Sequence, residues 1–422
     1  MKVRHLMPSG ILTLLLTSAL WGQQHETFDA LLREALDHNP DLAVQRSNVD
    51  RNKGIARQAG TVGPPQLTYT RMEVPTLSLG DPASVNIGLM QMVAFPTKLF
   101  AESDLAASRV QSAEYDVSRR RVEIAAQVHT ALAMLWEAQH RLRILGDMRS
   151  LLRQIADAAT TRLQVDRASQ QEVLTTSIEL EDVSASEAVA RQDVDAAVAM
   201  LRTILGRPAE APVGTAVLDT LITIDRSADH LVAMAGRVNP LLLRDSIAAV
   251  QGELTEHLAR QEYLPDITLG IERVVMPRTD MTAWNISAGI SLPFAPWTLG
   301  RTAGRVQEAV AERSMREADL RASRLRTAGD ITGARARLRG LAVRLDALEN
   351  RILPQSALSV RSSLAEYQTG KSSYLMLLDA ARMDLSMRLD AVMTRMNYER
   401  ELAALAQAVG VLTPAALLAA GE

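Results

Sequence analysis

The strongest constraint on this chain is an internal duplication of its sequence pattern. Asn39-Pro40 recurs as Asn239-Pro240, 200 residues later. Each copy is followed by two strand-like segments and then by two long helical segments. A pattern that repeats over this length indicates one structural unit that occurs twice in the fold. We therefore predict two structural repeats and a C-terminal tail, at residues 23–225, 226–410 and 411–422.

Two short turn sequences, 204 positions apart, separate the long helical segments of the repeats. In the second turn, Gly370 is suited to end one helix and Ser373 to cap the next. In the first turn, Asp166 and Ser169 stand at the equivalent positions. Each turn is therefore predicted to join two antiparallel helices. The two tips of these helical hairpins are expected at residues 163–170 and 367–373.

The hydrophobic period changes from about 3.6 residues to about 2 in each repeat, which predicts β-strands. Apolar residues alternate with small or polar ones, as between Ser84 and Val93. A membrane-spanning strand has about 9–11 residues and shows this alternation. A soluble hairpin packed on helices is the alternative. The four predicted strands are at residues 66–74, 84–93, 266–276 and 284–292.

Aromatic residues support the membrane interpretation of these strands. Six of the 14 aromatic residues lie in or beside the strand segments. Tyr and Trp concentrate at membrane–water interfaces, where an apolar ring and a polar group are both solvated favourably. The candidate membrane-interface aromatic residues are Tyr69, Phe95, Tyr263, Trp284, Phe294 and Trp297.

Four strands are too few for a closed membrane barrel, because single-chain barrels have about eight strands or more. Open strand edges in lipid would leave backbone groups unpaired, at a large cost in free energy. The helical segment from Lys98 past Ala159 would extend for about 90 Å. Such a rod needs other helices beside it. Both features predict that several copies of the chain associate.

The N-terminus has the pattern of a secretory signal. Lys2 and Arg4 precede an apolar run from Ile11 to Leu20, and Gly22 offers a small residue for cleavage. The run is about ten residues long, whereas a membrane-spanning helix needs roughly 20. We predict a signal peptide at residues 1–22 and export of the protein.

Charge and motifs argue against several function classes. The net charge is −3 and the basic and acidic residues are interspersed, which argues against nucleic acid as a partner. The chain has no cysteine, no phosphate-binding loop and no paired histidine spacing. We therefore predict no enzyme activity, no cofactor and no metal site. The remaining alternatives are a membrane duct and an exported periplasmic coiled-coil adaptor or scaffold without membrane strands.

The residues resemble the TolC family of outer-membrane efflux proteins over nearly all of the chain after the signal. The shared features include both Asn-Pro pairs, both strand pairs, Leu-Gly-Arg-Pro at 205–208 and Leu-Pro-Gln at 353–355. The most specific is Tyr367-x-x-Gly370-x-x-Ser373 followed by Leu-Leu-Asp379. The chain is short for the family, and in this it is similar to the heavy-metal and cation efflux branch.

The resemblance implies a mainly α fold with a small β part, assembled as a homotrimer. Duplicated antiparallel helical hairpins would form an α-barrel tunnel in the periplasm. Four strands from each chain would form one twelve-stranded β-barrel among the lipids of the outer membrane. The implied function is the exit duct of a tripartite efflux system. Such a duct passively conducts substrates received from a periplasmic adaptor (membrane fusion) protein and an inner-membrane pump.

The resemblance also implies roles at the two tips. Acidic rings narrow the tunnel entrance in the family, and Asp379 stands at one of these positions while Met376 occupies the other. Glu172, on the equivalent turn of the first hairpin, could supply a further acid. These three are the candidate gate and selectivity residues. The residues implied to contact the adaptor are Asp166, Arg167, Ser169, Tyr367, Gly370, Lys371 and Ser373.

Both sets have a simpler interpretation that the sequence leaves open. Carboxylates are favoured near helix N-termini, so Asp379 could be an ordinary solvated acid. The tip residues could serve only to form the turns. Methionines also follow the second tip at roughly helical spacing, and thioethers suit soft metal ions. We instead expect these five to form helical core: Met376, Met383, Met387, Met393 and Met396.

Overall fold

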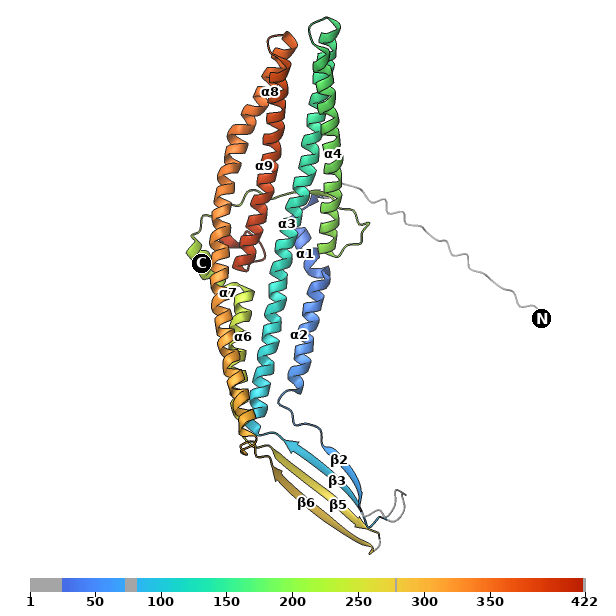
Figure 1. Ribbon diagram of the computed structural model, residues 1–422, viewed down its shortest axis with the longest axis vertical. Coiled ribbons are helices and arrows are strands. Elements are labelled where there is room, and N and C mark those ends of the chain that lie inside the picture. The colour runs from blue at the N-terminus through green and yellow to red at the C-terminus, as the bar shows by residue number, and fades with distance from the viewer. Residues whose placement is uncertain (1–24, 73–81, 278, 420–422) are drawn as a thin grey trace, which may run out of the picture.

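The computed structural model describes residues 25–72, 82–277 and 279–419. In these residues a long helical body continues at one end into a four-stranded sheet (Figure 1). The predicted signal peptide, residues 1–22, lies outside the described residues, as does the end of the strand predicted at 66–74. The termini of the described chain lie beside the middle of the helical body, away from both ends.

Two helical hairpins lie side by side and carry their tips at the same end of the molecule (Figure 1). The helices of the first hairpin are α3 (Pro96–Gln164) and α4 (Gln170–Leu205). The second hairpin consists of α7 (Leu299–Ala347), the π-helical turn η1 (Leu348–Ile352), α8 (Leu353–Thr369) and α9 (Tyr374–Val409). Helix α3 continues through Gly146 without a break. Its 69 residues extend for about 100 Å.

The second hairpin has a π-helical turn just before Pro354, and the helix continues beyond it. Proline has no backbone donor for the preceding turn of an α-helix. The five-residue turn η1 ends at Ile352, two residues before Pro354, and α8 begins at Leu353. In a π-helical turn the backbone hydrogen bonds span five residues instead of four. This wider turn can accommodate a proline, which lacks the amide donor that a regular α-helix needs. The outer helix of the second hairpin therefore extends from α7 to the tip as one rod.

Each repeat begins with a pair of shorter helices. They are α1 (Phe28–His38) and α2 (Pro40–Gln58) in the first repeat, and α5 (Ala228–Val238) and α6 (Pro240–Gln261) in the second. A short helix, α10 (Ala416–Ala419), lies at the C-terminal end. Two-residue strands β1 (His25–Glu26) and β4 (Thr215–Ala216) pair in parallel beside α3.

The duplicated Asn-Pro pairs perform the same structural task twice. The side-chain oxygen of Asn39 caps α2 by accepting from the backbone of Asp41 at 3.0 Å, and its amide donates to the Ile204 carbonyl at 2.8 Å. Asn239 caps α6 in the same way and donates to the carbonyl of Ala408 at 2.7 Å. Each asparagine thus ties the start of a short helix to the end of the returning helix.

The end of α9 lies so close to the second Asn-Pro pair that only glycine fits. Gly410 has φ 93°, a left-handed conformation that other residues rarely adopt. A Cβ atom there would lie 2.4 Å from the Cα of Asn239. Gly206 ends α4 with φ 69° at the equivalent place in the first repeat. Gly206 and Gly410 therefore end the returning helices of the two repeats in the same left-handed conformation.

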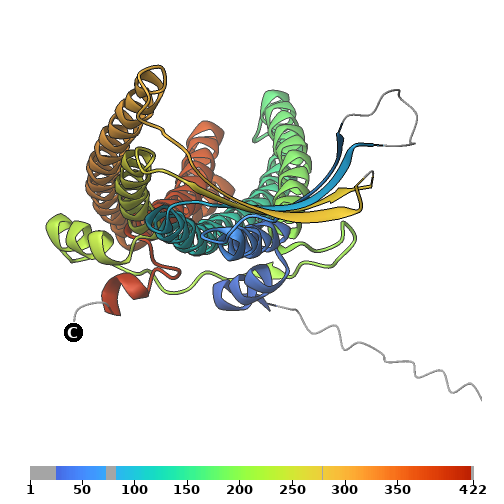
Figure 2. The same ribbon diagram turned by 90° about the horizontal axis from the view of Figure 1, so that it is seen from below.

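The sheet is antiparallel throughout, with strand order β2-β3-β5-β6, and forms a curved band (Figure 2). Its strands are β2 (Gln66–Met72), β3 (Ser84–Val93), β5 (Ile267–Met276) and β6 (Met281–Ile290). Strand β6 starts before the predicted residue 284, because a tight turn with Asp280 at φ 52° lets Met281 pair with Met276. It also ends before the predicted residue 292.

The pairing register gives the sheet one apolar face and one polar face. A row across the apolar face contains Leu67, Leu89, Ile271 and Ile286, and all four side chains are exposed. The adjacent row on the opposite face contains Thr68, Gly88, Glu272 and Asn285. In the described chain the outer strands β2 and β6 each pair along one side only.

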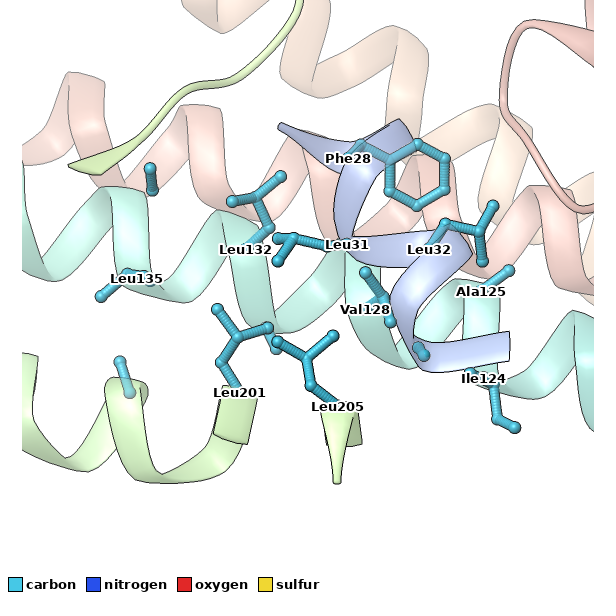
Figure 3. Packing of buried hydrophobic residues seen from close by; sticks show 14 of the residues in the cluster. Phe28, Leu31, Leu32, Ile124, Ala125, Val128, Leu132, Leu135, Leu201 and Leu205 are labelled. Atoms are coloured by element: carbon cyan, nitrogen blue, oxygen red, sulfur yellow. The ribbon is translucent and has the colours of Figure 1, made fainter. Parts of the chain in front are cut away.

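The core of the first repeat lies where α1 crosses α3 and the end of α4 (Figure 3). Leu31 of α1 is fully buried, and Leu132 of α3 and Leu201 of α4 are also buried there. An equivalent cluster in the second repeat joins α5, α7 and α9. These clusters join the ends of α4 and α9 that are distant from the tips to the other helices of each repeat.

Arg207 ties the loop that follows α4 to helix α1. Its Nε and Nη2 donate to the two carboxylate oxygens of Glu34 at 2.6 and 2.7 Å, and Nη1 donates to Glu26 at 3.1 Å. These hydrogen bonds hold the pKa of Glu34 below its ordinary value, although burial acts in the opposite direction. A bidentate arginine–carboxylate pair of this kind also fixes the geometry of the two groups.

We expect Arg207→Gln to lower the free energy of unfolding at neutral pH by about 1–3 kcal/mol. Because the folded-state pKa of Glu34 is lowered, the stabilisation from this pair is present above the carboxyl's unfolded-state pKa. It is lost as the pH falls through the folded-state value. Thermal unfolding of both proteins at about pH 7 and about pH 3 should therefore show a smaller difference at the lower pH.

The matched control is Arg351→Gln. Arg351 pairs with Asp346 at 3.2 Å, but both side chains are more than 60% exposed. Exposed pairs contribute little to stability, so this variant should unfold like the wild type. An Arg207 variant that unfolds like the control at neutral pH would contradict the structural role of the Glu34 pair.

Candidate functional site at the helical tips

The two tip turns have the same backbone conformation at equivalent positions. Asp166 has φ 57° and Gly370 has φ 76°, so both residues are left-handed. The amide of Asp166 donates to the Leu163 carbonyl and that of Gly370 to the Tyr367 carbonyl, each at 3.0 Å. Asparagine, aspartate and glycine are the residues that tolerate this conformation best. The equivalence predicted for Asp166 and Gly370 is therefore present in the structure.

Serine caps the helix after each turn. The Ser169 side chain accepts from the backbone of Glu172 at 3.3 Å, and the Glu172 carboxylate accepts from the backbone of Ser169 at 3.5 Å. This reciprocal pair is a capping box, which favours the start of α4. Ser373 caps α9 by accepting from the backbone of Met376 at 3.4 Å. Both serines thus have a local role in the turns.

Tyr367 joins the two tips to each other. Its side chain is 1% exposed, and its hydroxyl donates to the Glu172 carboxylate at 2.8 Å. The guanidinium of Arg162 lies over the ring, 4.5 Å from its centre, and donates to the Tyr367 carbonyl. Burial and the neighbouring Glu172 raise the pKa of Tyr367, so the hydroxyl keeps its proton. We name Arg162, Glu172 and Tyr367 the tip latch.

The tip latch differs from the roles expected for two of its members. Tyr367 was expected to contact a partner, but its buried side chain faces the neighbouring hairpin instead. Glu172 was a candidate to supply a further acid to the entrance, and its carboxylate accepts hydrogen bonds from Tyr367 and from the backbone of Ser169. The sequence prediction missed Arg162 altogether. The only signal was its position one residue before the turn, where the second repeat has Glu366 of opposite charge.

Helices α4 and α9 make a second connection below the tips. The hydroxyl groups of Thr176 and Tyr374 are 2.9 Å apart, and the Tyr374 ring meets that of Tyr367 edge-on with centroids 6.2 Å apart. Arg382 of α9 donates to Glu179 of α4 at 3.3 Å. This hydrogen bond raises the pKa of Arg382, which therefore stays charged. The two hairpins are thus held together over the first turns of α4 and α9.

Asp379 remains available for ions or partners. It is exposed on α9, and among the described residues it forms no hydrogen bond and no ion pair. The nearest charged neighbour on its own helix is Arg382, whose guanidinium is directed to Glu179. Met376 lies one turn before Asp379 and is 61% exposed. Of the three candidate gate residues, Asp379 alone presents a carboxylate without a hydrogen-bond donor in the described chain.

The remaining tip residues form an exposed surface that could receive a partner. Two apolar side chains lie beside them, Val165 at 59% exposure and Leu375 at 69%. The exposed tip residues that the sequence singled out are Asp166, Arg167, Ser169, Gly370, Lys371 and Ser373. Their contact with an adaptor protein stays a prediction.

The methionine prediction was wrong for the described chain. Met376, Met383 and Met393 are 61%, 63% and 52% exposed, and Met387 and Met396 are half-buried. The core side of α9 is occupied by leucine, alanine and tyrosine residues that pack against α3 and α8. Helical spacing is present, but it places most of the methionine side chains toward solvent.

Most of the candidate interface aromatics are exposed near the sheet. Tyr69 and Trp284 lie within the sheet and are each 63% exposed. Phe294 and Trp297 lie beyond the end of β6 and are 52% and 85% exposed. Tyr263 is 37% exposed. Phe95, by contrast, is half-buried at the start of α3.

Two negative findings apply to residues 25–72, 82–277 and 279–419. No helix there is both long enough and apolar enough to cross a membrane. No group of three or more His, Asp or Glu side chains there is arranged to hold a metal ion.

Long paired helices that continue into a sheet with one exposed apolar face are the arrangement expected of an outer-membrane channel protein. The model of the outer membrane efflux protein family matches residues 31–207 and 253–411. The chain belongs to this family. It is therefore an outer-membrane efflux channel protein that extends into the periplasm, and the resemblance found in the sequence is confirmed.

Individual relatives are similar over most of their length. The cobalt-zinc-cadmium resistance protein CzcC of Cupriavidus metallidurans is 24% identical over 370 residues, which cover 84% of this chain and 83% of the relative. The crystal structure of CusC has a TM-score of 0.77 at 18% identity and covers 91% of this chain and 92% of its own. VceC of Vibrio cholerae has a TM-score of 0.75 at 18% identity, with 91% and 96% covered. The fold is thus shared with solved outer-membrane channels.

Proposed function

We propose that this chain forms the exit duct of a tripartite efflux system, as a homotrimer. The observation that carries the proposal is the sheet, which has an exposed apolar face and two strands paired on one side only. In lipid, such edges must be closed by further strands, since no water is present to bond the backbone. Three chains related by rotation would close one barrel from twelve strands.

The helical hairpins supply the remainder of the duct. They extend from one end of the sheet (Figure 1). In an inserted trimer they would therefore extend into the periplasm and surround a continuation of the pore. The tips then form the entrance, where the exposed tip surface meets a periplasmic adaptor coupled to an inner-membrane pump. Substrate passes without chemical change, and the energy for transport comes from the pump.

The tip latch gives the entrance a defined closed form. Arg162 and Glu172 belong to the first hairpin and hold Tyr367 of the second. Separating the hairpins would break a hydrogen bond to a charged group, which contributes about 1.5–3 kcal/mol. A partner that binds the separated tips better than the joined ones would shift this equilibrium and open the entrance.

Divalent metal cations are the first substrates to test. A carboxylate that projects into a pore attracts cations, and Asp379 of three chains would form one acidic ring. The similarity to a cobalt-zinc-cadmium resistance protein favours the same class of cargo. A single ring of Asp379 carboxylates would attract cations less strongly than two acidic rings, because the second acidic position of the family is occupied by Met376.

The test of the proposed function is to purify the protein from outer membranes in mild detergent and record it in a planar bilayer. A trimer with a small, stable conductance is the expected result. A protein that needs no detergent and gives no current would contradict the duct, because its strands would then not form a membrane barrel.

We expect Asp379→Ala to change the conductance of the reconstituted trimer and to weaken its block by divalent cations. The physical reason is the loss of one negative charge per chain at the narrow entrance, where low dielectric strengthens electrostatic attraction. Single-channel currents at increasing Zn²⁺ concentration measure both effects. Asp29→Ala is the control, because Asp29 is an exposed acid on α1, far from the tips. Identical block in both variants would make Asp379 an ordinary surface acid.

A further inference from the structure

Two arginines interrupt the apolar face of the sheet. The pairing register places Arg273 of β5 between Ile87 of β3 and Trp284 of β6, in the same row as Tyr69. Arg71 of β2 lies in the next row of this face. Every second residue of a strand shares a face, so both arginines are on the same side as the row of exposed leucines and isoleucines described above.

Neither arginine has an acidic partner among the described residues. Across residues 25–72, 82–277 and 279–419, neither guanidinium forms an ion pair or a hydrogen bond. The Nε of Arg71 is buried and unbonded, whereas Arg273 is exposed. Guanidinium groups without a partner in the described chain are available to an acceptor outside it, and the other donors of Arg71 and the whole guanidinium of Arg273 are the groups that can reach one.

The positions of Arg71 and Arg273 along their strands indicate where in the membrane the two side chains lie. Arg273 is the seventh of ten residues in β5 and Arg71 the sixth of seven in β2, so both lie nearer the strand ends that point away from the helices. A charged side chain is tolerated there because it can extend to the membrane surface, whereas it is strongly disfavoured at the bilayer centre. At that surface the abundant anions are the phosphates of lipid headgroups.

The guanidinium groups of the two arginines are suited to bind phosphate. A guanidinium donates to phosphate oxygens in a bidentate arrangement and keeps its charge at all relevant pH values. One strand separates β2 from β5, so the two backbones are about 10 Å apart. Long side chains at this separation can converge on one phosphate or hold two phosphates of one headgroup. Tyr69 lies two residues before Arg71 on β2 and Trp284 lies directly opposite Arg273, and both rings suit the interfacial region.

We propose that Arg71 and Arg273 form a binding site for the phosphate groups of an anionic lipid in the outer leaflet of the outer membrane. The proposal rests on the proposed function, because the strands must be inserted with the helices in the periplasm. The site lies on the outside of the barrel and takes no part in conduction. It anchors the sheet at a fixed depth and rotation in the membrane.

The experiment measures lipid retained by the purified trimer. Protein in mild detergent is incubated with phosphatidylcholine containing either lipid A or phosphatidylglycerol, and bound lipid is counted by native mass spectrometry. The wild type should retain anionic lipid at least about fivefold better than the double variant R71Q/R273Q. R71K/R273K should recover part of the retention, since the charge remains but the bidentate geometry is lost. R351Q, which removes an exposed arginine on η1, should bind like the wild type.

The outcomes separate this proposal from the proposed function. Preference for lipid A identifies a diphosphorylated glycolipid as the occupant, and preference for phosphatidylglycerol identifies a phospholipid. Equal retention by the wild type and R71Q/R273Q would overturn the site even if both conduct normally as trimers. A wild type without trimers or conductance would instead contradict the duct itself. Full conductance of R71Q/R273Q with reduced lipid retention is the result that we expect.

Discussion

Replacing Gly370 with proline should abolish export while leaving the trimer assembled. Gly370 has φ 76°, and its amide donates to the Tyr367 carbonyl at 3.0 Å. Proline is fixed at a φ of about −65° and has no amide hydrogen, so the turn cannot keep its shape. The cost, about 3 kcal/mol or more, would depopulate the native tip roughly a hundredfold. Substrate efflux from cells with the variant as their only copy measures the effect.

Gly370→Ala is the matched control for the tip. An added Cβ would find Arg162 Nη2 as its nearest neighbour, at 3.8 Å, which is an ordinary contact. The variant therefore suffers only the left-handed backbone strain of roughly 1–2 kcal/mol and keeps its amide donor. We expect most export to remain. If the proline variant formed trimers on native electrophoresis and exported substrate normally, the conformation of the tip would not be required for export.

The repeat was predictable because duplicated joints require the same residue types twice. The Asn-Pro pairs cap equivalent helices, and Asp166 and Gly370 adopt the same left-handed turn. The presence of strands was also predictable, since a helix would not produce a sustained alternation of apolar and polar residues. The ends of the strands were less predictable. The tight turn at Asp280 lets β6 begin at Met281, before the predicted residue 284. Local patterns thus determine elements better than they determine boundaries.

The side-chain environment at the tips could not be obtained from the sequence. Whether Tyr367 faces solvent or the other hairpin depends on contacts between residues about 200 positions apart, such as its hydrogen bond to Glu172. Arg162 belongs to the same contact and has no counterpart of the same charge in the second repeat. Helical spacing likewise left the direction of Met383 open, because a long helix has several possible packing faces.

The sheet face is the other place where a single substitution has a large expected effect. We expect Ile286→Lys to prevent assembly in the outer membrane. Ile286 is the sixth of ten residues in β6 and is 85% exposed on the apolar face. A lysine facing lipid near mid-membrane costs about 2–4 kcal/mol per chain, or roughly 6–12 kcal/mol per trimer. The amount of heat-resistant trimer in isolated outer membranes measures the loss.

Asn285→Lys distinguishes this lipid-facing effect from a general intolerance of charge in β6. Asn285 is adjacent to Ile286 in the strand but faces the opposite side, where its amide donates to Glu272 at 3.3 Å. A lysine there would lie beside a carboxylate in the pore, so the trimer should assemble and only its ion selectivity should shift toward anions. Equal loss of trimer in both variants would mean that the apolar face does not meet lipid, and the inserted-barrel interpretation would fail.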